Sequence, residues 1–292
     1  MKVGLIGTGL LGNAIGLNLL KKGHTLTVYN RTKSKTDALA KNGAKIAESP
    51  KSVSENSEIV LVVVKNADAV RKVAFGDGCI ACGNHDGLVV ADISTINPID
   101  SENIAQEFQK RGMQYLDTPV MGGPNVAITG DLVMMVGGDN ATFNKFSNVF
   151  NDIASKVFYL GKNGTAHAVK LAMNLQIALL ALALSEGITL TKGAKIDPEI
   201  FLKILNSTYF KTGMSENKAY KMIKESFEPT FTLSNLKKDL ETINQAASAF
   251  GLRLPMAQMA NEVYQKAEDA GFGEIDYTGI LAYLEKHSSK SE

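Results

Sequence analysis

The feature that most constrains the fold is a proline-free stretch between Gly164 and Gly193. It is rich in Ala, Leu and Met, which favour helices, and at 1.5 Å per residue it predicts one helix roughly 40 Å long. Few globular helices are this long, so we expect it to span two domains. The 14 residues from Leu171 to Leu184 are apolar nearly all round, which predicts burial on several sides. This run is shorter than the roughly 20 residues that cross a bilayer, so we expect no membrane span.

Composition favours a soluble protein of two domains. The chain has 292 residues, of which 45% are hydrophobic, and a net charge of +1, enough for a large core. It lacks the basic excess that would attract nucleic acid, so we expect no nucleic-acid partner. Met1 and Lys2 lead straight into a strand-like segment without the apolar region of a signal peptide. We therefore expect a cytoplasmic protein.

Two cysteines, Cys79 and Cys82, form the sequence C-I-A-C, with His85 three residues further on. These side chains could contribute to a zinc site, but a second ligand pair at zinc spacing is missing. Two free thiols or a local disulfide explain the spacing better. We expect no metal.

The N-terminal segment reads as a strand, a glycine-rich turn and a helix. The apolar strand Lys2–Ile6 precedes a G-x-G-x-x-G motif made of Gly7, Thr8, Gly9, Leu10, Leu11 and Gly12. Glycines at these positions let backbone N–H groups and a helix N-terminus approach a pyrophosphate. The motif alone is weak evidence, but a second strand at residues 25–29 supplies the context it needs. The segment predicts dinucleotide binding.

The end of the second predicted strand indicates which dinucleotide is bound. An NAD site usually has Asp or Glu there to hold the ribose 2′-hydroxyl, whereas this chain has Asn30, Arg31 and Thr32. A carboxylate would repel a 2′-phosphate, and an arginine pairs with one. We expect NADP rather than NAD, although an arginine at a strand end can also be simply exposed.

Strand and helix signals alternate through the first half and stop after it. Alternation of this kind predicts an α/β fold with a doubly wound, Rossmann-type parallel sheet. Beyond the long helix only helical patterns appear. We predict a dinucleotide-binding domain at residues 1–162 and an all-helical substrate and oligomerisation domain at residues 163–292, joined by the long interdomain helix.

Four segments in order resemble the β-hydroxyacid dehydrogenase family, which includes 3-hydroxyisobutyrate dehydrogenase and tartronate semialdehyde reductase. They are G-L-I-G-T-G-L-L-G near the N-terminus, D-T-P-V-M-G-G-P at 117–124, G-K-N-G-T-A-H-A-V-K-L-A-M-N at 161–174 and F-T-L-S-N-L-K-K-D-L at 231–240. A further match, G-F-G-E-I-D at 271–276, extends the resemblance over essentially the whole chain. Each motif is loose, but their order and spacing are specific.

The resemblance implies a role for each matching residue. Lys170 matches the catalytic lysine, and Asn174 the asparagine that helps to hold the substrate. Gly122 and Gly123 match the loop that binds the substrate carboxylate through backbone amides. The remaining matches lie near the cofactor and substrate: Lys238 lines the cleft beside the nicotinamide, Thr95 contacts the cofactor, and Val64 and Lys65 occupy a cofactor loop.

Three residues depart from the family pattern. Met121 stands where relatives usually have a serine, so a hydroxyl that would bind the carboxylate is absent. Ala166 replaces a common glycine. His167 adds an imidazole three residues before Lys170, on the same face of the helix. It either tunes the lysine or contacts substrate, but an exposed polar residue on the first turn is the simpler expectation.

We expect reversible hydride transfer between NADP(H) and a small β-hydroxy acid or its semialdehyde. Lys170 would exchange the hydroxyl proton, which near neutral pH requires burial or nearby positive charge to lower its pKa. Two alternatives remain: a reductase of imines or other non-carboxylate substrates on the same scaffold, and a non-catalytic NADP-binding interaction module. The resemblance also implies a homodimer or homotetramer with a 6-phosphogluconate dehydrogenase-like C-terminal domain.

Overall fold

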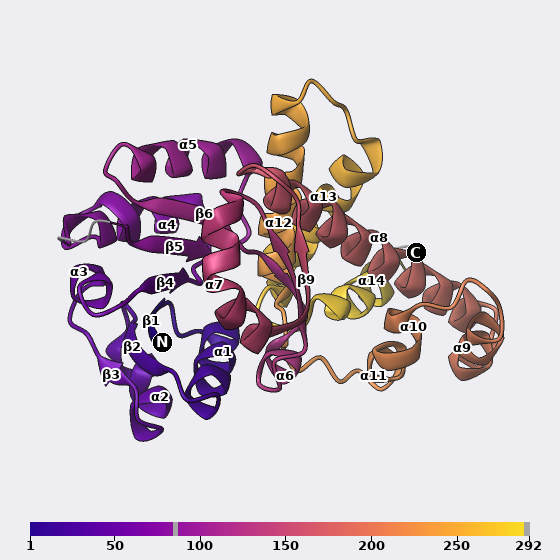
Figure 1. Cartoon of the computed structure of the whole chain (residues 1–292). Coiled ribbons are helices and arrows are strands. Elements are labelled where there is room, and N and C mark those ends of the chain that lie inside the picture. The colour runs from indigo at the N-terminus through magenta and orange to yellow at the C-terminus, as the bar shows by residue number, and fades with distance from the viewer. Residues whose placement is uncertain (84–86, 289–292) are drawn as a thin grey trace. The chain divides into compact units, whose positions relative to one another are not determined.

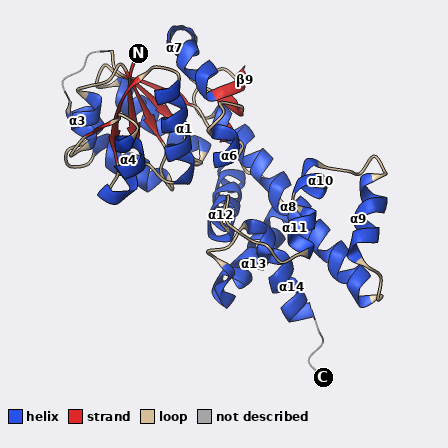
Figure 2. Ribbon diagram, turned by 90° about the horizontal axis from the view of Figure 1, so that it is seen from below, coloured by secondary structure: helices blue, strands red, loops and turns tan. Residues whose placement is uncertain are grey.

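The computed structural model describes residues 1–83 and 87–288. Contacts within the chain divide it into two compact units, Met1–Lys170 and Leu171–Glu292. Figure 1 shows the elements of both units, and Figure 2 shows strands in the first and helices in the second. The division falls inside the long helix, after Lys170. The domain boundary that we placed after residue 162 stays a prediction.

The first unit is built on a six-stranded sheet with the order β3-β2-β1-β4-β5-β6. Every neighbouring pair in it is parallel, as the alternating pattern predicts. Its strands are β1 (Lys2–Ile6), β2 (Thr25–Tyr29), β3 (Lys45–Ile46), β4 (Ile59–Val62), β5 (Val89–Asp92) and β6 (Gln114–Asp117). The order reverses between β1 and β4, and such a switch point is where open sheets bind ligands.

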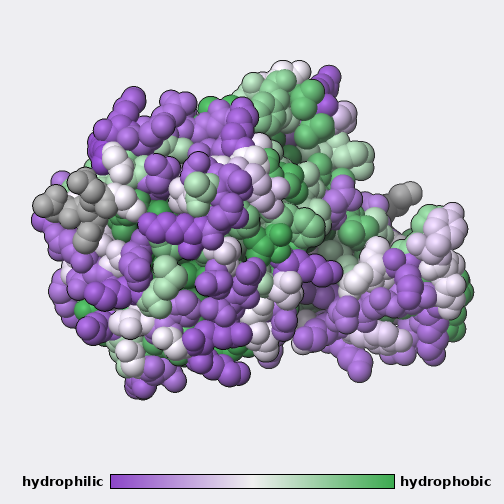
Figure 3. Space-filling model, viewed as in Figure 1, coloured by the Kyte–Doolittle hydropathy of each residue, from purple (hydrophilic) through white to green (hydrophobic). Residues whose placement is uncertain are grey.

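Helices cover both faces of this sheet, because successive strand residues point to opposite sides. Leu5 packs into one hydrophobic cluster with Ile15, while its neighbour Ile6 packs into the other with Phe108. In the view of Figure 3 the outer surface of this unit is mainly hydrophilic. The helices are α1 (Leu10–Lys21), η1 (Lys33–Thr36), α2 (Asp37–Lys41), α3 (Pro50–Ser54), α4 (Ala67–Phe75), η2 (Ile80–Cys82), α5 (Pro98–Gln109), α6 (Pro124–Ala127) and α7 (Asn140–Ile153).

A second, three-stranded sheet completes the first unit, which the sequence pattern did not predict as a separate sheet. It has the order β7-β8-β9, formed by β7 (Val120–Met121), β8 (Leu132–Val136) and β9 (Ala154–Tyr159). β7 runs antiparallel to β8, and β9 runs parallel to it. A β-bridge between Asp117 and Gly137 links it to the main sheet. Met121 is therefore held on a short strand just beyond β6.

The second unit is helical, as predicted, and its strand-like pairing among the described residues is one isolated bridge between Thr232 and Asp276. Its main core joins α8 to α12 and α13 through Leu171, Leu236 and Tyr264, among others. The helices are α8 (Thr165–Gly193), α9 (Pro198–Asn206), α10 (Gly213–Asn217), α11 (Ala219–Ile223), α12 (Leu233–Ala249), α13 (Pro255–Ala267), η3 (Glu268–Phe272), η4 (Tyr277–Gly279) and α14 (Ile280–Ser288).

Helix α8 has the predicted length, but the expectation that it is buried on several sides is wrong. Met173 and Leu180 are 42% and 38% exposed, and only 33% of the most apolar 18-residue window is buried. That window has a mean hydropathy of 1.7, so by length and composition alone α8 could cross a membrane. Our estimate of a 14-residue run therefore understated the apolar segment. Core helices of soluble proteins pass the same test, and the buried side of α8 packs on α12 and α13.

The sulfur atoms of Cys79 and Cys82 form a disulfide, one of the two explanations we offered for their spacing. His85 lies outside the described residues. Among residues 1–83 and 87–288, no group of three or more His, Cys, Asp or Glu side chains is placed to hold a metal ion.

Candidate active site

The glycine motif forms a tight turn between β1 and α1. Gly7 has a φ of 97°, and a Cβ built there would collide with the carbonyl oxygen of Val63. A Cβ on Gly12 would collide with the carbonyl of Gly7, so both positions need glycine for packing. Gly9 differs, because the space beside it is open and it stands directly before the first turn of α1. Its backbone and the N-terminus of this 12-residue helix can therefore approach an anion.

Asn30, at the end of β2, braces this turn. Its Oδ1 accepts a hydrogen bond of 3.1 Å from the backbone N–H of Thr8, and its Nδ2 donates one of 2.9 Å to the carbonyl of Thr32. Arg31 lies between them and is exposed. The amide of Asn30 thus holds the loop, which leaves Arg31 as the charged side chain available to a phosphate.

The next two strands of the sheet add a second part of the cofactor edge. Ser94 follows β5, and its hydroxyl accepts a 3.0 Å hydrogen bond from the backbone N–H of Val64, which follows β4. Lys65 is exposed and Thr95 is half-buried. Because β4 and β5 are parallel neighbours, these residues lie at the same, carboxyl edge of the sheet.

Two buried aspartates end β5 and β6 side by side. Asp92 and Asp117 are Cα partners in the parallel register, and both are 0% exposed. Asp92 accepts hydrogen bonds from the hydroxyl of Tyr115 at 2.8 Å and from the backbone N–H of Ser94 at 2.9 Å. These contacts tie the loop after β5 to the neighbouring strand.

Asp117 holds the start of α8. Its Oδ2 accepts a 2.5 Å hydrogen bond from the backbone N–H of Gly164, directly before the helix. Its Oδ1 accepts from the side chains of Ser101 at 2.7 Å and Asn163 at 3.0 Å. The end of β6 therefore fixes where α8 begins, five residues before Lys170.

Burial dominates the electrostatics of both aspartates. It raises the pKa of Asp117 to about 6, against the lowering effect of its hydrogen bonds with Asn163, Ser101 and Gly164. It also raises the pKa of Asp92, against an opposing interaction with His167. His167 is thus close enough to Asp92 to affect its ionisation.

The expectation that His167 is an exposed residue is wrong. Its side chain is 0% exposed, on the first turn of α8. The helical pattern gives its face relative to Lys170, but it does not show that this face is buried. His167 is therefore buried rather than exposed to solvent.

Lys170 lies beside Met121. Its Nζ donates a hydrogen bond to the sulfur of Met121 over 3.3 Å, and the lysine is partly buried. Gly122 and Gly123 follow directly, and Gly122 has a φ of 122°, which favours glycine. The first unit thus brings the predicted lysine to the loop expected to bind the substrate's carboxylate.

The second unit brings Asn174 and Lys238 to a shared partner, Asp239. Asn174 Nδ2 donates a 2.6 Å hydrogen bond to Asp239 Oδ2, and Lys238 forms an ion pair with Oδ1 of the same carboxylate. Asn174 and Asp239 are both 1% exposed. We did not predict a role for Asp239. The only signal was its place in K-K-D-L, where the carboxylate directly follows a lysine singled out for the cleft.

Two family models cover nearly all of the chain. Residues 2–161 match the NAD binding domain of 6-phosphogluconate dehydrogenase, and residues 164–284 match the NAD-binding domain of NADP-dependent 3-hydroxyisobutyrate dehydrogenase. The chain belongs to the β-hydroxyacid dehydrogenase family. Relatives named as reductases and dehydrogenases match nearly its whole length, and the chain is an enzyme of the dehydrogenase and reductase class.

Individual relatives agree with this assignment. Glyoxylate/succinic semialdehyde reductase 1 of Arabidopsis thaliana is 30% identical, covering 96% of this chain and 97% of the relative. The 2-hydroxy-3-oxopropionate reductase of Escherichia coli is 31% identical, covering 98% and 97%. A crystal structure of 3-hydroxyisobutyrate dehydrogenase from Salmonella typhimurium superposes with a TM-score of 0.88 at 25% identity, covering 97% of this chain and 99% of that one.

Proposed function

We propose that this chain transfers a hydride between NADP(H) and a small β-hydroxy acid or its semialdehyde, with Lys170 as general acid and base. The observation that carries the proposal is the contact between Lys170 Nζ and Met121 on the strand that leads into Gly122 and Gly123. This contact supports the proposal because a lysine that transfers a proton would then act near backbone amides that can bind an oxyanion. The names of the reductases that resemble the chain support the substrate class.

The residues at the sheet edge fit a dinucleotide. The space beside Gly9, the start of α1 and the loop braced by Asn30 form a surface open to a pyrophosphate. The bound nicotinamide would supply or accept the hydride. Thr32, Val64, Lys65 and Thr95 border the same edge and are our candidates for further cofactor contacts.

Lys170 would move the proton. When an aldehyde is reduced, the developing alkoxide takes a proton from the Lys170 ammonium, and in the reverse direction the neutral amine removes the proton of the alcohol. Asn174, one helical turn further along α8, would orient the same oxygen. Its bond to Asp239 fixes the amide in one orientation, and Lys238 forms an ion pair with that carboxylate.

We propose NADP rather than NAD because of Arg31. Its guanidinium is exposed beside the braced loop, and this strand end carries no carboxylate that would hold a 2′-hydroxyl. We further propose a cytoplasmic location, a cofactor domain at residues 1–162, a helical substrate domain at residues 163–292, and a homo-oligomer.

A second candidate, reduction of an imine or another non-carboxylate substrate, is favoured by one observation. Met121 presents a thioether where a hydroxyl would help to bind a carboxylate, and a thioether is only a weak acceptor. A substrate without a carboxylate would not need that hydroxyl. The contact with Lys170 favours the carbonyl chemistry, because that chemistry uses the lysine to donate and accept a proton.

A turnover screen tests the proposal. Purified protein with NADPH would be assayed against glyoxylate, succinic semialdehyde, tartronate semialdehyde and methylmalonate semialdehyde, and with NADP⁺ against 3-hydroxyisobutyrate and serine. Cyclic imines would be included to test the second candidate. We expect turnover of at least one semialdehyde or of glyoxylate. Turnover of imines alone would replace the proposal, and cofactor binding without any turnover would favour a non-catalytic module.

A further inference from the structure

The sulfur of Met121 is a reactive atom in contact with the proposed proton donor. Lys170 Nζ donates a hydrogen bond to this sulfur over 3.3 Å. Met121 is half-buried and is followed directly by the exposed Gly122, so a small molecule in solvent can reach this loop. Thioether sulfur is polarizable and open to oxidation, which neither a serine nor an aliphatic side chain would be. A chemical change at Met121 therefore acts directly on Lys170.

Oxidation by a hydroperoxide converts a methionine thioether to a sulfoxide. A sulfur lone pair forms the new S–O bond while the O–O bond of the peroxide breaks. The proton on the transferred oxygen passes to the leaving group, which departs as water or as an alcohol. The sulfur loses two electrons and the peroxide gains them, so no other reactant is needed. The side chain changes from apolar to polar and gains an oxygen acceptor.

A sulfoxide would hold Lys170 in a different state from a thioether. Sulfur accepts a hydrogen bond weakly, whereas an oxygen with partial negative charge accepts a strong one from an ammonium group. Because the sulfur of Met121 is already in contact with Lys170 Nζ, rotation of the methionine side chain is enough to bring a bound oxygen to that nitrogen. A hydrogen bond to the charged form of a group favours that form. Oxidation would therefore stabilise the ammonium of Lys170 against the neutral amine.

The other methionines define the controls that this site needs, and all ten methionines of the chain lie among the residues that the structure describes. Four are at most 4% exposed and are shielded from a peroxide: Met113, Met134, Met135 and Met222. Four are 42% or 52% exposed and should be oxidised readily: Met1, Met173, Met256 and Met259. Met121 and Met214 are half-buried. Peroxide alone therefore changes several methionines, and only single variants can assign an effect to Met121.

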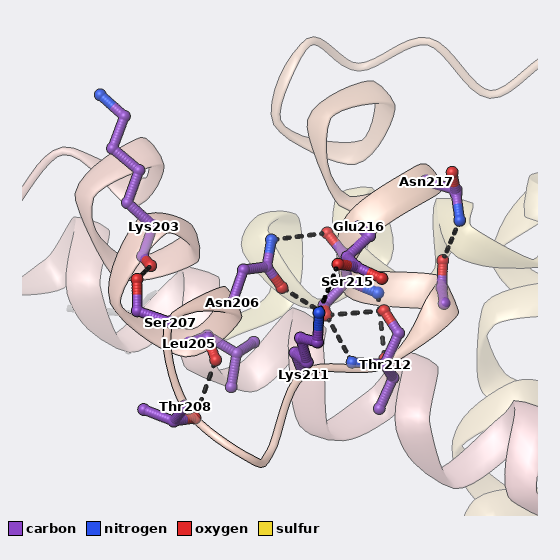
Figure 4. Close-up of polar contacts among 11 residues, drawn as sticks. Lys203, Leu205, Asn206, Ser207, Thr208, Lys211, Thr212, Ser215, Glu216 and Asn217 are labelled. Carbon is purple, nitrogen blue, oxygen red and sulfur yellow. Dashed lines mark hydrogen bonds and ion pairs between the residues drawn. The ribbon is translucent and has the colours of Figure 1, made fainter.

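Met214 is the matched control. It is half-buried on α10 and packs against the apolar clusters of the second unit. Its surroundings are held by hydrogen bonds, among them the reciprocal pair between Thr212 and Ser215 (Figure 4). The lysine of this loop, Lys211, pairs with the carboxylate of Glu216 at 3.2 Å. Oxidation of Met214 should therefore leave the proposed active site unaffected.

We propose that Met121 is a site of reversible oxidation by hydroperoxides, and that its sulfoxide binds the ammonium of Lys170 and lowers turnover. The inference rests on the proposed function, because it takes Lys170 as the group that exchanges the proton. Oxidation of an alcohol needs the neutral amine, so this direction loses most, whereas reduction of an aldehyde starts from the ammonium and loses less. A methionine sulfoxide reductase with a dithiol reverses the change, since the oxygen leaves as water and the dithiol becomes a disulfide.

Treatment of the full chain with hydrogen peroxide tests the modification. Peptide mass spectrometry should show one added oxygen at Met121, and alcohol oxidation with NADP⁺ should fall about tenfold, the effect of one charge-assisted hydrogen bond. Methionine sulfoxide reductases with dithiothreitol should restore it. After the same treatment Met121→Leu should keep the activity it had before, whereas Met214→Leu and Met173→Leu should lose activity like the unmutated chain. A Met121 peptide without added oxygen, or equal losses in Met121→Leu, would overturn the proposal.

Met121→Gln tests the contact without peroxide, because the glutamine oxygen is a permanent acceptor. Compared with Met121→Leu, its alcohol oxidation should begin about one pH unit higher, as a tenfold preference for the ammonium requires. A carbon-13 NMR titration of the lysine side chains follows Lys170 without turnover, and Lys170→Arg identifies the signal by removing it. Equal titrations of Lys170 in the Gln and Leu variants would overturn the inference. A displaced titration in a protein that turns over no substrate would support the contact and count against the proposed function alone.

Discussion

The side-chain nitrogen of Lys170 lies 3.3 Å from the sulfur of Met121, which comes 49 positions earlier in the chain. The pairing matters because one residue is the proposed proton donor and the other stands where the family usually offers a hydroxyl. A thioether is a weak acceptor for an ammonium group, so it does little to hold the charged form of the lysine. The two residues are therefore best tested one at a time.

Lys170→Ala should lower kcat by about 10²–10⁴-fold and leave cofactor affinity nearly unchanged, because positioned proton transfer contributes that much. Lys170→Arg should not restore activity, since arginine keeps its charge but cannot release a proton near neutral pH. Steady-state kinetics on the best substrate of the screen, with NADPH titrations beside them, check both. An arginine variant retaining most of its kcat would falsify the acid–base role.

Met121→Ser should improve turnover of 3-hydroxyisobutyrate mainly by lowering KM, because the hydroxyl adds a hydrogen bond to the carboxylate. We expect weak turnover of this substrate by the unmutated protein. Met121→Leu keeps the size without the hydroxyl and is the matched control. If the unmutated protein already turns over 3-hydroxyisobutyrate efficiently, the hydroxyl is dispensable.

Arg31→Ala should weaken NADPH binding by about ten- to a hundredfold, the value of one charge-assisted contact, and leave NADH binding almost unchanged. Asn30→Asp also affects the loop itself, because Asn30 donates a hydrogen bond to the carbonyl of Thr32 and a carboxylate could not. The double change Asn30→Asp with Arg31→Ala should still narrow or reverse the preference.

Lys35→Ala removes a nearby exposed charge and serves as the control in the same fluorescence titrations. Equal affinities of the unmutated protein for NADPH and NADH would remove the basis of this prediction.

His167→Gln should lower kcat/KM by about tenfold, because His167 is buried three residues before Lys170 on α8 and its interaction with Asp92 lowers the pKa of that carboxyl. The pKa of Asp92 should rise further, since the interaction with His167 opposes the effect of burial. His24→Gln is a matched control, because that histidine pairs with Asp152 instead. Kinetics across pH 5–9 would show the difference, and unchanged kcat/KM in His167→Gln would contradict it.

Asp117 should make the folded protein less stable as pH rises from about 4 to about 6. Its pKa is raised from the ordinary 3.8 to about 6, so the folded state favours the proton, and the stabilisation is lost once that proton leaves. The difference corresponds to about 3 kcal/mol. Asp117→Asn cannot titrate, so relative to the unmutated protein its free energy of unfolding should increase over this range.

Urea unfolding at several pH values measures that difference, and a carbon-13 NMR titration of the carboxyl group measures the pKa directly. A stability difference that stays constant from pH 4.5 to pH 7.5 would show that Asp117 does not carry this effect.

The sequence predicted the parts of the fold whose signals are local. The glycine motif and the apolar strand Lys2–Ile6 identify their elements directly, and the structure places the motif in the turn between β1 and α1. The second sheet was missed because β7 has two residues, too few to show a period.

The parts of the site that were missed depend on contacts between distant segments. Composition could not show that His167 affects the ionisation of Asp92, because the two residues lie in distant segments of the chain. In the same way, a role for Asp239 can be recognised only once α12 packs on α8, where its carboxylate accepts a hydrogen bond from Asn174. A helical pattern shows on which side of the helix a residue lies. Which segment packs against that side depends on the fold of the whole chain.

The pairing of β5 with β6 also provides a way to recognise a misfolded molecule. Asp92 and Asp117 stand opposite each other only in one register, and a shift of one residue would turn either side chain to the opposite face of the sheet. Gly164 would then lose its anchor, and Lys170 would no longer be carried to Met121. A slipped sheet would keep most of its secondary structure but lose turnover. In refolding experiments, recovered activity would therefore report strand alignment that circular dichroism cannot detect.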